Sequence, residues 1–123
     1  MQSIFIAPAE VYSPRWQQAF PAANLVDYSA LLPADLTQTL LWVVLGDPQL
    51  PEKLSRWIAA GARVVALTGT EDPREAKRVL ELGASGYLHY LAAARVLEQV
   101  GQVIQMGGLW LGVDLMRQLV FAT

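Results

Sequence analysis

The chain has 123 residues and a formal net charge of −2, from nine basic and eleven acidic side chains. This length is typical of one domain with its own hydrophobic core, and the acidic balance disfavours a nucleic-acid surface. The sequence has no cysteine, which excludes disulfides and thiolate metal sites. Its single histidine, His89, excludes a two-histidine zinc site within one chain.

Hydrophobic residues make up 54% of the chain and charged residues 16%, which is apolar for a globular domain. The longest purely apolar run, residues 40–45, is far shorter than the ~20 residues of a membrane-spanning helix. The N-terminus lacks the basic and apolar regions of a secretory signal. We therefore expect a cytoplasmic protein without a membrane segment, part of whose apolar surface forms an interface.

Short apolar runs alternate with amphipathic stretches along the chain. The continuous run 40–45 is typical of a strand covered on both faces. Asp72-Pro73 is a helix-start signal, and Gly83 is a stop signal. In chain order, the expected strands are 3–7, 24–28, 40–45, 63–68 and 86–88, and the expected helices are 14–20, 31–39, 52–60, 73–82, 92–106 and 113–120.

This βα alternation predicts an α/β domain: a doubly wound, five-stranded parallel sheet with helices on both faces, followed by a C-terminal helical tail. In such sheets the ligand crevice lies at the carboxyl ends of the strands. Those ends carry Ala7-Pro8, Gly46-Asp47, Thr68-Gly69 and Leu88-His89-Tyr90. We expect any functional site to lie there.

Residues 64–69 (Val-Val-Ala-Leu-Thr-Gly) and 83–88 (Gly-Ala-Ser-Gly-Tyr-Leu) resemble the second half of a bacterial response-regulator receiver domain. Residues 107–111 (Gly-Gly-Leu-Trp-Leu) resemble the exit from receivers of NarL/LuxR-type transcriptional regulators. The resemblance implies a CheY-like, flavodoxin-like receiver over residues 1–107. It further implies a linker and tail helix over 108–123 that lead to a C-terminal DNA-binding domain.

The resemblance also implies roles for single positions. Asp47 takes the phosphoacceptor position, and Thr68 and Tyr87 take the two switch positions that respond to the phosphoryl group. The acidic pair that holds Mg²⁺ in receivers is replaced by Pro8 and Ala9. The position of the usual phosphate-pairing lysine is occupied by Tyr90.

The loss of the acidic pair and the lysine predicts a pseudo-receiver whose phosphorylation is absent or impaired, because without Mg²⁺ a carboxylate and a phosphoryl group repel each other. We expect no catalysis, no metal and no cofactor. The expected role is a regulatory interaction and dimerisation module in signal transduction and transcription regulation. Its homodimer would use the last two helices and the fifth strand, residues 73–105.

Two alternatives remain open. One is a phosphorylatable receiver that accepts a phosphoryl group from a histidine kinase at Asp47, with Glu10 and Asp27 recruiting Mg²⁺. Asp47 and Thr68 are 21 positions apart, about two helical turns fewer than the receivers it resembles, and Asp-Pro is also a helix-start signal. The other is an enzyme on the same scaffold with His89 as a base, but the sequence has no glycine-rich phosphate loop.

One further motif bears on ligands. Some related regulators bind cyclic di-GMP through a Trp-Leu-Thr-Arg-like motif after the receiver, and residues 110–113 here read Trp-Leu-Gly-Val. The arginine that would stack on guanine and pair with phosphate is absent. We expect Trp110 to be an apolar anchor for the tail helix or for a dimer.

Overall fold

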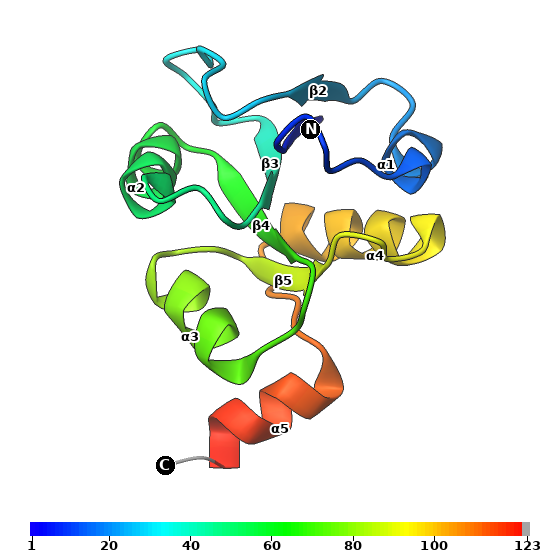
Figure 1. Cartoon of the computed structure of the whole chain (residues 1–123), viewed down its shortest axis with the longest axis vertical. Helices are drawn as coiled ribbons and strands as arrows, with labels where there is room; N and C mark the ends of the chain where they lie inside the picture. The colour runs from blue at the N-terminus through cyan, green and yellow to red at the C-terminus, as the bar shows by residue number, and fades with distance from the viewer. Residues whose placement is uncertain (122–123) are drawn as a thin grey trace.

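Five parallel strands form the centre of the computed structural model, which describes residues 1–121 (Figure 1). The strand order β2-β1-β3-β4-β5 is the doubly wound, flavodoxin-like order, so the predicted fold class is confirmed. The order reverses at β1, whose neighbours β2 and β3 follow it in the chain. The strands are β1 (Gln2–Ile6), β2 (Asn24–Val26), β3 (Thr39–Val44), β4 (Arg63–Thr68) and β5 (Gly86–His89).

Helices cover both faces of this sheet. Figure 1 shows α1 and α4 on one side of the strands, α2 and α3 on the other, and α5 beside α3. None of the helices within residues 1–121 is long and apolar enough to cross a membrane. The helices are α1 (Pro14–Ala19), α2 (Leu50–Ala59), α3 (Pro73–Glu81), α4 (Ala94–Gln105) and α5 (Val113–Phe121).

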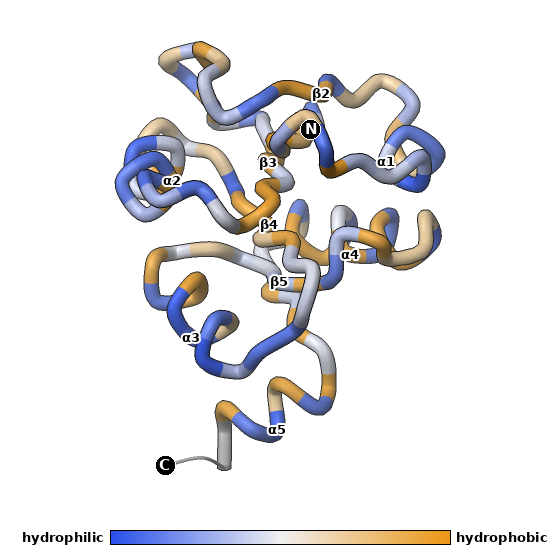
Figure 2. The backbone as a smooth tube through the Cα atoms, in the orientation of Figure 1, coloured by the Kyte–Doolittle hydropathy of each residue, from blue (hydrophilic) through white to orange (hydrophobic). Residues whose placement is uncertain are grey.

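Cover on both faces explains the apolar runs of the central strands. Every residue of β3 is buried, and β4 is buried beyond its first residue. In Figure 2 the hydrophobic colour accordingly concentrates on β3 and β4, while the outer side of α3 is hydrophilic. The side chains of successive strand residues alternate between two cores, one beneath α2 and α3 and one beneath α1 and α4.

The predicted helix at 31–39 is wrong, because this segment is an irregular loop. Asp35 Oδ1 accepts a hydrogen bond from the Thr37 backbone N–H at 3.0 Å, which closes a local turn and takes the N–H that a helix over 31–39 would direct to the carbonyl of residue 33. The buried Leu36 anchors the loop, and its N–H donates to the Ala60 carbonyl at 2.9 Å. The strand predicted at 24–28 ends at Val26, because Asp27 begins another turn.

The tail after α4 packs against the sheet edge. The Trp110 N–H donates to the Ser85 carbonyl at 2.9 Å, and its carbonyl accepts from the Tyr87 N–H at 3.1 Å, so Trp110 pairs with the outer edge of β5. Further along, Leu115 of α5 is buried in the core beneath α3. Residues 108–119 therefore pack against the sheet and its helices as part of the same domain.

Candidate functional site at the carboxyl ends of the strands

Parallel strands bring the ends of β1, β3, β4 and β5 to one edge of the sheet. Pro8, Asp47, Thr68 and Tyr90 lie at or just beyond these ends, as the sequence predicts. Loops at this edge are free to vary while the sheet holds their starting points fixed. The chemistry of the edge depends on what each side chain contacts.

Asp47 lies in the loop between β3 and α2, directly after Gly46, whose φ of +137° favours glycine. Its Oδ2 lies 2.7 Å from Lys53 Nζ, and its side chain is only 15% exposed. This hydrogen bond from Lys53, more than any other contact, holds the pKa of Asp47 below its usual range. The carboxylate is therefore ionised and held by an ammonium group of α2.

Tyr28 occupies the space beside this ion pair. Its hydroxyl donates a hydrogen bond to the carbonyl of Val44, the last residue of β3. Burial raises the pKa of Tyr28 to about 12, with smaller contributions from the carboxylates of Asp47 and Glu10. Lys53 Nζ also donates to the Tyr28 carbonyl at 3.2 Å and lies 5.7 Å from the centre of the ring. Lys53 thus contacts both Tyr28 and Asp47.

The end of β1 is apolar where receivers carry acids. Pro8 and Ala9 line a hollow of about 290 Å³ whose remaining walls are mostly apolar. Asp27 is the one charged residue among those walls, and its Oδ1 accepts from the Ser29 hydroxyl at 2.6 Å and the Ser29 N–H at 2.9 Å. Those hydrogen bonds lower the pKa of Asp27 and hold its carboxylate in a local turn.

The side chains at this edge do not fit Mg²⁺. The ion requires octahedral oxygen ligands, and receivers supply several of them as carboxylates. Among residues 1–121, no three acidic or histidine side chains converge in a way that could hold a metal ion. Asp47 faces an ammonium, Asp27 is held in its turn, and Glu10 is exposed.

Thr68 and Tyr87, the two positions expected to act as switches, are joined by a third residue. Tyr87 is fully buried, and its hydroxyl donates to Glu75 Oε1 at 2.7 Å. The hydroxyl of Thr68, which is also buried, lies 2.7 Å from the same Glu75 oxygen and 2.9 Å from the Thr70 carbonyl. Burial raises the pKa of Tyr87 to about 12, and the bond to Glu75 adds to this shift. Glu75 therefore fixes both hydroxyls in one arrangement.

His89 and Tyr90 form a rigid turn after β5. His89 Nε2 donates to the Gly69 carbonyl at 2.9 Å, while Nδ1 accepts from the Leu91 N–H at 3.0 Å. The Tyr90 ring stacks on the imidazole at 5.1 Å, and the Tyr90 carbonyl accepts from Trp16 Nε1 at 2.8 Å. Since both imidazole nitrogens hold the backbone, the described contacts give His89 a structural role.

Three residues at this edge lie outside the sequence-based expectations: Lys53, Tyr28 and Glu75. Each acts through a side chain that reaches another element, so periodicity carries no signal for it. Lys53 lies six residues after Asp47, on the first turn of α2. The residue at which α2 begins must be known before this contact can be predicted.

Comparison with known proteins agrees with this architecture. No protein-family model and no curated protein matches the chain. Among solved structures, it is similar to the crystal structure of a two-component response regulator of the LuxR family from Aurantimonas sp. SI85-9A1. The TM-score is 0.67 at 16% identity, and the match covers 97% of this chain and 94% of that chain. The fold is receiver-like: a doubly wound, flavodoxin-like sheet similar to the structure of that response regulator. At this identity the likeness concerns the fold alone.

Replacing Lys53 by methionine is expected to raise the pKa of Asp47 towards its ordinary value, because the main hydrogen-bond donor to the carboxylate is lost. A lowered pKa stabilises the fold above the ordinary value near 4, and this contribution is lost as pH falls through the lowered pKa. The variant should therefore lose less stability on acidification. Carbon NMR of the Asp47 carboxyl group measures the pKa.

Lys77→Met is the matched control, because Lys77 lies 4.0 Å from Glu81 in an exposed pair on α3. This variant should leave the pKa of Asp47 unchanged. An equal pKa in the wild type and in Lys53→Met would contradict the geometry described for the ion pair.

Proposed function

We propose that this chain is a pseudo-receiver: a regulatory interaction and dimerisation module of bacterial signal transduction that works without phosphorylation or with impaired phosphorylation. The observation that carries this proposal is the Asp47–Lys53 ion pair at 2.7 Å, together with the presence of Pro8 and Ala9 in the place of the acidic pair. Its setting would be the cytoplasm, and its output would be transcription, through a DNA-binding domain attached to it.

The physical argument concerns charge. Phosphoryl transfer to a carboxylate brings two anionic groups together, and in receivers a divalent cation bridges them. Here an ammonium group holds Asp47, and apolar side chains stand at the end of β1. Tyr90 packs on His89 where a second cation would meet the phosphate. These features favour a domain that has the receiver fold but lacks the groups needed to accept a phosphoryl group.

Treatment with acetyl phosphate and Mg²⁺ is expected to leave the intact mass of the protein unchanged. A receiver with a complete acidic pair, treated in parallel, serves as the positive control. A phosphoryl adduct that disappears in Asp47→Asn would overturn the proposal and establish the alternative, a receiver phosphorylated at Asp47. An adduct that persists in Asp47→Asn would place the reaction on another residue, and the role of Asp47 in the proposal would stand.

The interaction surface that we propose is the α3-β5-α4 side together with the tail laid over it. Trp110 covers the outer edge of β5, so the tail forms part of the surface that a partner would contact on this side. Leu109, Val113 and Met116 expose their apolar side chains, and Val113 is 70% exposed. Exposed apolar side chains grouped on one segment are typical of an interface. A twofold dimer is the usual assembly for such a surface.

The wild-type domain is expected to sediment as a dimer at tens of micromolar, and Val113→Glu is expected to weaken the dimer at least about tenfold, equivalent to about 1.4 kcal/mol. Val113 is the first residue of α5, where an acidic side chain is compatible with the helix. Gln18→Glu, which adds the same charge at an exposed position of α1, should leave the dimer intact. A monomer at all concentrations would remove dimerisation through this domain from the proposal.

A further inference from the structure

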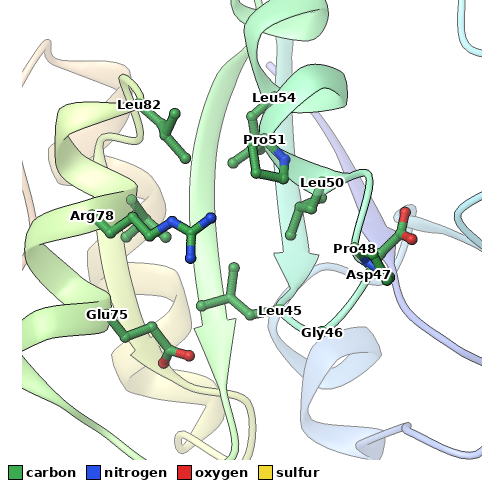
Figure 3. A pocket seen from close by; sticks show the side chains of 11 residues that line it. Leu45, Gly46, Asp47, Pro48, Leu50, Pro51, Leu54, Glu75, Arg78 and Leu82 are labelled. Atoms are coloured by element: carbon green, nitrogen blue, oxygen red, sulfur yellow. The ribbon is translucent and has the colours of Figure 1, made fainter.

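A cavity of about 280 Å³ lies between α2 and α3, at the level where β3 ends (Figure 3). Most of its lining is apolar and comes from both helices and the β3–α2 loop. Two charged side chains of α3, Glu75 and Arg78, complete the wall beside Asp47 of the loop. The apolar lining residues are Leu45, Pro48, Leu50, Pro51, Leu54, Val79 and Leu82.

Arg78 is an exposed residue of α3 whose side chain forms part of the wall of this cavity. Figure 3 shows its guanidinium extending from α3 towards α2, across the cavity, while the Asp47 carboxylate points away. Asp47 is bound to Lys53, and Glu75 holds the hydroxyls of Thr68 and Tyr87. Among residues 1–121, the Arg78 side chain makes no ion pair and no hydrogen bond.

A mainly apolar cavity that is open to solvent and presents the Arg78 guanidinium, with its two carboxylates already bonded to Lys53 and to two hydroxyls, fits an organic anion with an apolar body. A carboxylate can receive two parallel hydrogen bonds from arginine, and the apolar walls remove the rest of the molecule from water. At about 30 Å³ for a group the size of water, the cavity holds about ten non-hydrogen atoms. An aliphatic carboxylate of eight carbons has this size.

We propose that the α2–α3 cavity binds a medium-chain aliphatic carboxylate through Arg78, and that this ligand takes the place of the phosphoryl group as the input of the domain. The inference rests on the proposed function, since it supplies the signal that a pseudo-receiver lacks. Glu75 connects the two: it lines the cavity, lies three residues before Arg78 on α3, and holds both switch hydroxyls.

The connection is electrostatic. A carboxylate bound at Arg78 approaches Glu75, its neighbour one turn earlier on the same helix face. Repulsion between the two anions favours movement of Glu75 away from the cavity and changes its hold on Thr68 and Tyr87. Since the Tyr87 N–H also donates to the Trp110 carbonyl, the change reaches the strand edge that carries the tail.

Octanoate, at concentrations below micelle formation, is the probe. In an amide NMR titration, octanoate is expected to bind with shifts at residues 45–54 and 75–82 that extend to Thr68 and Tyr87. Octanol has the same chain without the charge and should bind at least about tenfold more weakly. Arg78→Gln should weaken octanoate about tenfold and leave octanol unchanged. Arg74→Gln, on the same helix but outside the cavity lining, is the matched control.

Three results would overturn the inference: no octanoate binding at millimolar concentration, binding that Arg78→Gln does not weaken, or shifts centred on the apolar tail in place of the cavity. Its failure is distinguishable from failure of the proposed function. A phosphoryl adduct at Asp47 overturns the function whether or not octanoate binds. If neither octanoate binding nor a phosphoryl adduct is found, the ligand inference is wrong and the proposed function stands.

Discussion

Replacing Trp42 by alanine is expected to lower the free energy of unfolding by about 4 kcal/mol. Trp42 lies in the middle of β3 and is fully buried. Its ring stacks on Phe5 at 5.3 Å and packs against Phe20 at 5.2 Å, while its Nε1 donates to Ser3 Oγ at 3.2 Å. The truncation opens a cavity between β3 and the helices α1 and α4, and it removes the aromatic contacts that join them.

Urea unfolding followed by circular dichroism measures this loss. A domain of this size has a total stability of about 5–15 kcal/mol, so the variant should still fold. Trp42→Phe keeps an aromatic ring in the stack and should lose about half as much. A loss below about 1 kcal/mol in Trp42→Ala would show that the layer beneath α1 and α4 is not packed as described.

Replacing Glu75 by alanine is expected to cost about 2–3 kcal/mol, because two buried hydroxyls lose a charged acceptor. The pKa of Tyr87, raised to about 12, should fall towards 10 but remain above it, since burial is the larger cause. A raised tyrosine pKa stabilises the fold below pH ~10, and this contribution is lost as pH rises through about 12. NMR of the Tyr87 ring carbon and urea unfolding measure the two effects.

Two neighbouring changes make this result specific. Glu75→Gln keeps an oxygen acceptor and should recover about half of the lost stability. Glu81→Ala removes an exposed carboxylate at the end of the same helix and should change stability by less than about 0.5 kcal/mol. Equal stabilities of Glu75→Ala and Glu81→Ala would contradict the link between Thr68 and Tyr87.

The sheet was predictable because burial on both faces leaves a direct trace in the sequence. β3 and β4 read as continuous apolar runs, and all of β3 is buried. Helix boundaries were similarly marked: the Asp72 side chain accepts from the Arg74 N–H at 2.8 Å, as an N-cap should. Right-handed connections then limit how the strands can be joined, while the order β2-β1-β3-β4-β5 agrees with the doubly wound arrangement that the family resemblance implies.

The segment 31–39 was not predictable in the same way. Its leucines suggest one helical face, yet a local turn at Asp35 and the anchoring of Leu36 to Ala60 decide its course. A tertiary contact of this kind outweighs a weak helical preference. The loop that results places Tyr28 where its hydroxyl can reach the end of β3.

The position of the candidate site was predictable from the sequence, but two of the residues that contact its side chains were not. Asp47 and Thr68 lie at the predicted edge, and Tyr87, inside β5, reaches the same Glu75 oxygen as Thr68 through its hydroxyl. Their partners, Lys53 and Glu75, come from the following helices, α2 and α3. A local sequence pattern does not show which charged side chain of a helix contacts the sheet edge. That depends on the residue at which the helix begins and on how the helix packs.

The central claim is that the Asp47 edge no longer receives a phosphoryl group. The most direct measurement is an amide NMR titration with Mg²⁺, followed by Mg²⁺ with beryllofluoride, a stable mimic of the phosphoryl group. The account predicts no response at millimolar metal and none on addition of beryllofluoride. Shifts centred on Asp47, Thr68 and Tyr87 that spread to α4 would contradict it and show a working receiver.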